Sequence, residues 1–196
     1  MIEILEDRRF LSATLANGVL TVNGTNRNDF IHIAPKNGSL LAQVNKTHQT
    51  FKESDVKSLK VNGLSGNDNI SFGSTQIGAT VDGDDGNDVI LGTANADTIS
   101  GGKGHDYIFA GGGNDSVTGG DGNDVIIGGK GNDTLHGGAG NDVISGADGD
   151  DQLFGDAGND LLFGAAGSDK VDGGAGTDRA LKQGNDTFTH VEKVWK

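Results

Sequence analysis

The sequence predicts an all-β solenoid, and three observations support that prediction. Residues 83–181 repeat with a period of nine, which is typical of a fold that stacks one short structural unit on the next. Gly contributes 35 of the 196 residues, which indicates frequent tight turns. One aliphatic residue recurs in nearly every unit, as expected for short strands that send a single side chain into a narrow core.

The composition indicates that this fold needs support from outside the chain. Only 33% of the residues are hydrophobic and the formal net charge is −13, a combination that usually leaves a chain disordered. There is no Cys, so no disulfide can hold the coils together. Residues 83–181 contain 18 Asp, no Glu and four basic residues, which gives −14, and the rest of the chain carries +1. Such an acidic chain is a poor ligand for nucleic-acid phosphates, and no apolar run is long enough for a transmembrane helix.

The repeat divides into eleven units without a gap. Position 6 is Asp in every unit. Position 4 is Gly except at Asn95, and position 8 is Val, Ile or Leu except at Ala180. The clearest units are GGKGHDYIF (101–109), GGDGNDVII (119–127), GGKGNDTLH (128–136) and GGAGNDVIS (137–145).

Each position in the unit has a physical role. Gly at positions 1, 2 and 4 permits a tight turn with positive φ, and Asn95 is expected to adopt the left-handed conformation in place of Gly. Positions 7 to 9 are expected to form a short strand whose position-8 side chain points inward. Two units then make one coil of 18 residues, and units two apart in sequence stack directly, about 4.8 Å apart.

Stacking aligns the position-6 carboxylates in two columns. Carboxylates about 4.8 Å apart repel strongly unless a cation lies between them. Carboxylate and carbonyl oxygens are hard ligands that suit Ca²⁺, whereas zinc would favour His or Cys, and the loops offer only His105. The candidate metal ligands are Asp88, Asp106, Asp124, Asp142, Asp160 and Asp178 in the first column, and Asp97, Asp115, Asp133, Asp151 and Asp169 in the second.

The pattern resembles the RTX, or hemolysin-type, calcium-binding nonapeptide family, GGxGxDxUx, in which U is a large aliphatic residue. The resemblance implies a right-handed parallel β-roll. It also implies that each ion lies between neighbouring coils, bound by the Asp and the position-1 and position-3 carbonyls of one unit, and by the Asp and the position-2 and position-4 carbonyls of the unit two further on. About nine Ca²⁺ are then expected, five in the first column and four in the second, and their charge would outweigh the −14 of the block. The carbonyl ligands implied include those of Gly101, Gly102, Lys103, Gly104, Gly119, Gly120, Asp121, Gly122, Gly137, Gly138, Ala139 and Gly140.

The flanks are expected to cap the roll, because repeat proteins need modified ends. We expect residues 1–82 to form an irregular β-rich cap, residues 83–181 the eleven-unit roll, and residues 182–196 a short cap whose final strand covers the open end. Hairpin turns are predicted at Asn17–Gly18 and Asn37–Gly38. Strands are predicted at Val19–Val22, Phe30–Ile33, Leu40–Val44 and Leu59–Val61.

Two degenerate copies of the unit precede the block, at residues 24–32 (GTNRNDFIH) and 63–71 (GLSGNDNIS). They place Asp29 and Asp68 at position 6. Neither Asp has a partner 18 residues away, so the interpretation as turn residues is favoured over the interpretation as calcium ligands.

The first 13 residues, MIEILEDRRFLSA, carry five charged side chains and lack the apolar core of a signal peptide. The stretch LEDRRFLSA is similar to the LEPRxLLS-type segment near the start of many bacterial surface proteins with such repeats, with Asp7 in place of Pro. In those proteins more residues precede the segment.

The sequence shows no pattern of a catalytic site: HExxH, GxSxG and P-loop motifs are all missing from the 196 residues. It predicts a secreted bacterial protein, extracellular or at the cell surface, whose roll folds on binding Ca²⁺ and serves as a non-catalytic structural or interaction module. The alternatives are a calcium-dependent adhesion or ice-binding module, and the repeat part of a larger secreted protease, lipase or epimerase. Ice binding would use outward Thr ranks, and these stop at Gln152 and Lys170.

Positions 7 and 9 differ between the two faces of the predicted roll. On one face they are mostly polar, and on the other they form an almost continuous apolar stripe, which usually marks an interface. The stripe predicts a homodimer or a protein partner, and the alternative is cover by the N-terminal section or the tail of the same chain. Its centre consists of Tyr107, Phe109, Val125, Ile127, Leu161 and Phe163.

Overall fold

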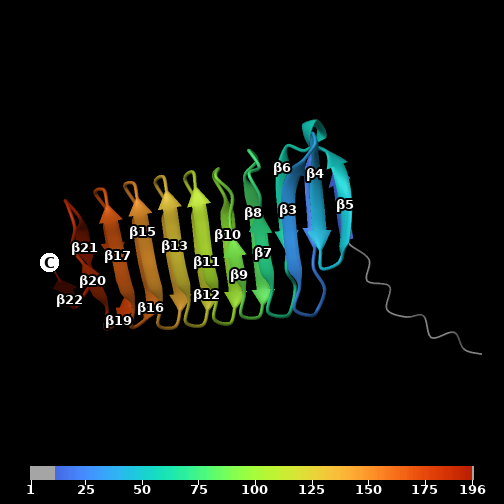
Figure 1. Ribbon diagram of the computed structural model, residues 1–196. Helices are drawn as coiled ribbons and strands as arrows, with labels where there is room; N and C mark the ends of the chain where they lie inside the picture. The colour runs from blue at the N-terminus through green and yellow to red at the C-terminus, as the bar shows by residue number, and fades with distance from the viewer. Residues whose placement is uncertain (1–11, 196) are drawn as a thin grey trace, which may run out of the picture.

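The computed structural model describes residues 12–195 as a roll of stacked coils closed between two sheets of eleven strands each (Figure 1). The LEDRRFLSA segment therefore lies almost entirely outside the described residues. Within residues 12–195 the only helix is the 3₁₀ turn η1 (Glu53–Asp55), and no helix there is long and apolar enough to cross a membrane. The predicted all-β parallel roll is confirmed.

The N-terminal end begins with antiparallel strands. A hairpin joins β1 (Ser12–Ala16) to β2 (Val19–Asn23), and β3 (Phe30–Lys36), β4 (Ser39–Val44) and β5 (Thr47–Lys52) form a meander. Asn and Gly have positive φ at both predicted hairpin turns, 53° and 84° at Asn17–Gly18 and 53° and 75° at Asn37–Gly38, as two-residue turns of this kind require. The sequence did not predict β1 and β5, which are polar or short.

From β6 onward every strand pairs in parallel with the strand two further along the chain, so consecutive strands alternate between the two sheets. The first sheet continues from β2 with β6 (Ser58–Asn62), β8 (Ala79–Asp85), β10 (Thr98–Lys103), β12 (Ser116–Asp121), β14 (Thr134–Ala139), β16 (Gln152–Gly158), β18 (Lys170–Asp172), β19 (Ala175–Gly176) and β21 (Thr187–Thr189). The second continues from β3 with β7 (Asn69–Phe72), β9 (Val89–Leu91), β11 (Tyr107–Gly112), β13 (Val125–Lys130), β15 (Val143–Asp148), β17 (Leu161–Ala166), β20 (Arg179–Leu181) and β22 (Lys193–Trp195).

The register of the repeats is 18 residues per coil. Ile99 pairs with Val117, and Ile108 pairs with Ile126, so each position meets its equivalent in the next coil. Most strands of the block are longer than the predicted triplet, because they run from position 7 through position 3 of the following unit, as in Tyr107–Gly112. Backbone pairing continues through the Gly residues, and only positions 4 to 6 are left to make the turn.

The core is a single line of aliphatic side chains between the sheets. Position-8 residues such as Ile108, Ile126 and Ile144 are fully buried, and they stack directly on their equivalents in neighbouring coils. Position 1 also faces inward, as the fully buried Ala110 shows. The same line begins before the repeat block, because β6, β7 and β8 already belong to the two sheets and β8 spans residues 82 and 83.

The C-terminal end is closed by two strands, one in each sheet. β21 pairs with β18 and β22 pairs with β20, whereas the sequence predicted one final strand. The Trp195 ring in β22 lies 5.9 Å from the Arg179 guanidinium and 5.0 Å from the Lys193 ammonium group. Both distances suit cation–π attraction, which helps to hold this short edge strand in place.

Candidate metal sites

The position-6 carboxylates lie in the turns at the two edges of the roll, one column on each edge. None of the eleven Asp residues of the block is more than 3% exposed. Carboxylates are almost never so deeply buried unless they are paired or bind a metal. Their burial therefore calls for an account of what each carboxylate oxygen contacts.

One oxygen of each carboxylate binds the backbone of the preceding coil. Oδ1 of Asp106 accepts a hydrogen bond of 2.7 Å from the amide of Asp88, and Oδ1 of Asp115 accepts one of 2.8 Å from the amide of Asp97. The same bond, at 2.7–2.9 Å, recurs along both columns. Each Asp therefore joins two coils through Oδ1.

The other oxygen has no partner in eleven cases. These Oδ2 atoms are buried and accept no hydrogen bond, although a buried unpaired polar group costs about 1–3 kcal/mol, and more when charged. They belong to Asp68, Asp88, Asp106, Asp115, Asp124, Asp133, Asp142, Asp151, Asp160, Asp169 and Asp178.

Most of these Oδ2 atoms border a small space that has oxygen on a second side as well. Beside the position-1 Gly101, a side-chain methyl group would collide with Oδ2 of Asp106 and with the carbonyl oxygen of Gly119 in the next coil. Gly83, Gly119 and Gly137 have the same surroundings in their own coils. A carboxylate oxygen and a carbonyl oxygen of the next coil thus face the same space, which is the type of donor that Ca²⁺ takes.

Carboxylates alone do not complete these sites. Within residues 12–195 no group of three or more His, Cys, Asp or Glu side chains is placed to hold a metal ion together. Any ion between the coils must therefore take most of its ligands from the backbone carbonyls of the turns. The residues present fit a hard divalent cation and do not fit zinc.

Ten of the eleven repeat turns share an unusual backbone with positive φ at positions 2 and 4. In the turn of residues 101–106 these are Gly102 (φ 112°) and Gly104 (φ 128°), and at position 4 a Cβ would strike the preceding coil. Non-Gly residues at position 2 also adopt this conformation, as Ala147 (φ 79°) and Asp156 (φ 67°) show. The stacking with neighbouring coils is therefore strong enough to hold them there.

The turn of residues 92–97 is the exception, and here the expectation for Asn95 is wrong. Neither Thr93 nor Asn95 has a positive φ. The amide of Thr93 donates to Oδ2 of Asp97 at 2.6 Å, and the Thr93 hydroxyl donates to Oδ1 at 2.9 Å. Asp97 is thus the one carboxylate of the repeat block whose two oxygens both have protein partners.

Three further Asp residues extend the columns beyond the block. Asp29 and Asp68 continue the first column, because the amide of Asp29 donates to Oδ1 of Asp68 and the amide of Asp68 donates to Oδ1 of Asp88. Asp186 continues the second column by accepting from the amide of Asp169. The expectation that Asp29 and Asp68 lack stacking neighbours is wrong, because their coils contain insertions that lengthen the spacing to 39 and 20 residues. The Gly residues at positions 1 and 4 of GLSGNDNIS were the signal that the spacing obscured.

Burial changes the acidity of the carboxyl groups. Loss of water raises the pKa of Asp106 and Asp115 to about 7 and that of Asp88 and Asp142 to about 6, although the backbone hydrogen bonds act in the opposite direction. Carboxylates of neighbouring coils raise the pKa of Asp106 and Asp115 further. Near neutral pH, protons therefore compete with any cation for these oxygens.

A second ladder of hydrogen bonds runs beside each Asp column at position 5. Oδ1 of Asn123 accepts a bond of 2.7 Å from the amide of Asn141, and Oδ1 of Asn141 accepts one of 2.9 Å from the amide of Asn159. His105 takes the same place, since its Nδ1 accepts from the amide of Asn123 at 2.7 Å. The sequence identified these residues only as turn formers.

The predicted apolar stripe lies on the outer face of the second sheet. Tyr107 is 42% exposed and Phe109 is 39% exposed, and Val125, Ile127, Leu161 and Phe163 are half-buried beside them. β3 and β7 extend this sheet at one end and β20 and β22 at the other, edge to edge. Neither the N-terminal strands nor the tail strands, as far as residues 12–195 show them, cover the stripe.

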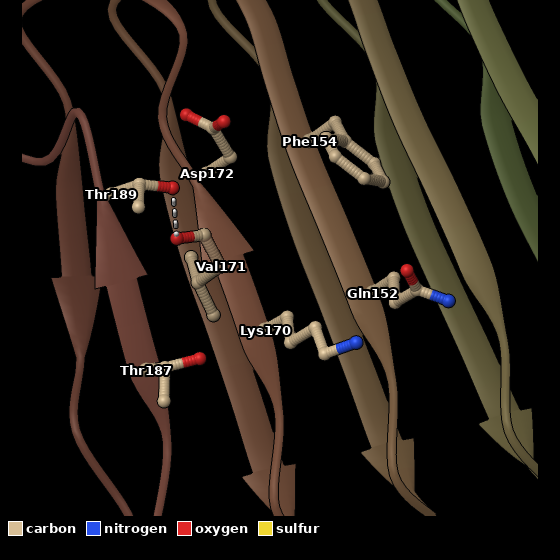
Figure 2. Close-up of a pocket in the computed structure, with 7 residues that line it drawn as sticks. All are labelled: Gln152, Phe154, Lys170, Val171, Asp172, Thr187 and Thr189. Atoms are coloured by element: carbon tan, nitrogen blue, oxygen red, sulfur yellow. Dashed lines mark hydrogen bonds between the residues drawn. The ribbon is translucent and has the colours of Figure 1, made fainter.

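The outer face of the first sheet is polar and carries a shallow groove near the C-terminal end. The groove has a volume of about 310 Å³ and lies across β16, β18 and β21 (Figure 2). Beside it the His136 ring stacks on Phe154 with the ring centres 4.4 Å apart. Its lining residues are Gln152, Phe154, Lys170, Val171, Asp172, Thr187 and Thr189. The groove is separate from the Asp columns, which follow the turns.

Comparison with known protein families agrees with the geometry of the turns. The pattern of the RTX calcium-binding nonapeptide repeat (4 copies) matches residues 82–117, 118–153 and 145–180, which is half of the chain. A search of curated proteins gave no match. With the match spanning the turns whose buried carboxylates stack in columns, the chain belongs to the RTX calcium-binding nonapeptide repeat family.

Proposed function

We propose that this chain is an extracellular, non-catalytic module whose roll forms when Ca²⁺ enters the carboxylate columns. The observation that carries the proposal is the set of eleven buried Oδ2 atoms without partners. At about 1–3 kcal/mol each, their combined cost exceeds the net stability of about 5–15 kcal/mol that is typical of a domain. A cation bound between the coils would remove that cost and the repulsion along each column.

The extracellular part of the proposal rests on calcium supply. Sites built largely from carbonyl oxygens in flexible turns resemble the weak extracellular class, with dissociation constants of about 10⁻⁴–10⁻³ M. Such sites would fill outside a cell, where calcium is abundant, and would release the ion inside it. The chain would then remain unfolded until it leaves the cell.

The non-catalytic part of the proposal rests on the repeat itself. The buried carboxylates are accounted for by their periodic place in the turns, and the sequence contains no motif for a nucleophile or a catalytic metal. A secreted enzyme that uses this roll as one of its parts remains the second candidate, because repeats of this family accompany catalytic domains in proteins they resemble.

We also propose that the apolar stripe pairs with the stripe of a second copy. The stripe centre carries no charged side chain, whereas the chain has a net charge of −13, so two copies can approach there with little repulsion. A flat, uncharged face of this kind is self-complementary about a two-fold axis. In that arrangement Arg179 and Lys193, at one end of the stripe, would lie far from the same residues of the other copy.

Calcium-coupled folding is tested by far-ultraviolet circular dichroism. In excess EDTA the repeats should give the spectrum of a coil, and added CaCl₂ should restore the β signal cooperatively. Equal concentrations of MgCl₂ are the control, because Mg²⁺ prefers to keep its water ligands. A β spectrum that persists after exhaustive chelation at neutral pH would refute the proposal.

A further inference from the structure

The turn of residues 63–68 lies outside the matched repeats, yet it contains an unsatisfied buried carboxylate. Asp68 is 2% exposed, and its Oδ2 accepts no hydrogen bond. Its Oδ1 accepts from the amide of Asp29 at 2.8 Å, so the side chain is held in one orientation. An unpartnered oxygen fixed in this way has the same status as the Oδ2 atoms of the repeat block.

The space beside Oδ2 of Asp68 has the same boundary as the spaces in the block. A methyl group at Gly63 would lie 2.6 Å from Oδ2 of Asp68 and 2.6 Å from the carbonyl oxygen of Gly83. The equivalent boundary in the next coil consists of Oδ2 of Asp88 and the carbonyl of Gly101. The first column therefore offers the same pair of oxygens one coil earlier than the repeat pattern predicts.

The backbone of this turn also has the conformation of the repeat turns. Leu64 at position 2 has a φ of 77°, and Gly66 at position 4 has a φ of 128°. A branched side chain such as Leu is rare in the left-handed region, and holding it there costs on the order of 1–3 kcal/mol. The amide of Gly66 donates to the Asp85 carbonyl at 2.8 Å, just as the amide of Gly104 donates to the Asp121 carbonyl at 2.7 Å.

Two neighbouring positions of the columns are closed by their own side chains. Both oxygens of Asp97 accept from Thr93, and Oδ2 of Asp29 accepts from the amide and the hydroxyl of Thr25. Oδ1 of Asp29 also accepts from the amide group of Asn45. A Thr at position 2 thus supplies the donors that a cation would otherwise replace.

We infer that the calcium set of this chain begins one coil earlier in the first column, with an ion between the turns of Asp68 and Asp88, and excludes the turn of Asp97. Six spaces in the first column and three in the second then remain between turns with open carboxylates. The total of about nine ions is unchanged, but one ion moves out of the matched repeats into the N-terminal section. This inference rests on the proposed calcium function and specifies which turns serve it.

Native mass spectrometry tests the assignment, because it counts the ions held by the folded chain. The variants are Asp68→Asn, Asp97→Asn and Asp29→Asn, each loaded at the lowest calcium concentration that saturates the wild type. Asn keeps the acceptor oxygen of the ladder and removes the charge. We expect Asp68→Asn to hold one ion fewer than the wild type, and Asp97→Asn and Asp29→Asn to hold the wild-type number.

An unchanged count for Asp68→Asn, or a lower count for Asp97→Asn, would overturn the inference while the calcium function stands. A wild type that holds no calcium would instead overturn the function. If Asp68→Asn does not fold, anomalous scattering from Tb³⁺ in wild-type crystals gives the answer directly. A peak between residues 63–68 and 83–88, with none between residues 92–97 and 110–115, is expected, and the reverse pattern would refute the assignment.

Discussion

The backbone amide of Asp106 donates a hydrogen bond of 2.8 Å to Oδ1 of Asp124, one coil further along the roll. Oδ2 of the same Asp124 side chain has no protein partner. One carboxylate therefore joins two coils through one oxygen and leaves the other for a cation. This division explains why Asp is required at position 6: Glu is longer by a methylene group, and Asn has only one oxygen.

The two roles of Asp124 can be separated by mutation. Asp124→Asn keeps an oxygen for the Asp106 amide and removes the charge, whereas Asp124→Ala removes both. We expect the calcium concentration at the folding midpoint to rise for Asn and to rise further for Ala. Asp178→Asn is the control, because Asp178 lies at the end of the first column and its amide already bonds to Glu192. Titration by circular dichroism should show a smaller shift for Asp178→Asn than for Asp124→Asn, and equal shifts would contradict the stacking of ions between coils.

Stability should respond to pH in opposite directions with and without calcium. Burial raises the pKa of Asp106 and Asp115 from 3.8 to about 7, so the folded chain without metal binds more protons than the unfolded chain between pH 4 and 7. Folded-state stability in EDTA should therefore be greatest below about pH 4 and fall as the pH rises to 7. With millimolar calcium the trend should reverse, because ionised carboxylates bind the ion. Thermal unfolding at several pH values in both buffers measures this, and parallel curves would count against coupled proton and calcium binding.

The position-4 Gly should be the least replaceable residue of a turn. Gly140 has a φ of 138°, and a Cβ there would strike the carbonyl of Gly122 in the preceding coil. We expect Gly140→Ala to lower the free energy of unfolding by more than about 2 kcal/mol, from strain and from separation of the coils. Gly112→Ala is the matched control at position 3, where a Cβ meets its nearest atom at 3.6 Å. Urea unfolding in saturating calcium should show little change for Gly112→Ala, and a similar loss in both variants would refute the explanation.

The apolar stripe predicts a dimer that depends on Phe109 and Ile127. Neither side chain belongs to the core or to a column, so Phe109→Ser with Ile127→Ser should leave calcium-induced folding nearly unchanged. The pair of substitutions should lower the apparent mass in sedimentation experiments with calcium. Thr98→Ser and Thr118→Ser, on the outer face of the first sheet, provide the control. A wild type that sediments as a monomer at high concentration would eliminate the dimer.

The repeat block was predictable because its sequence period equals its structural period. Eleven Asp residues at one position and aliphatic residues at another indicate stacking, and the structure stacks them with a register of 18 residues. The length of the strands was underestimated, because Gly-rich segments such as Ala110–Gly112 carry no side-chain pattern and yet pair as strand.

The sequence was less informative where stacking and spacing differ. The column continues to Asp68 and Asp29 across coils that contain extra residues, and a fixed period does not detect such coils. The turn of residues 92–97 fits the period but adopts another conformation, because the Thr93 side chain and amide satisfy Asp97. Which carboxylate oxygens remain open depends on side-chain contacts that the repeat pattern does not contain.

The opposite directions of the two ladders restrict how the length of this protein can change. At position 6 the acceptor lies in the following coil, and at position 5 it lies in the preceding coil. Loss or duplication of 18 residues rejoins both ladders in register and keeps each outer face continuous. A change of nine residues transfers everything beyond it to the opposite sheet, so that apolar positions such as Phe163 would continue the polar face. Insertions and deletions within the roll are therefore expected in whole coils, and the shortest heritable step is a pair of units.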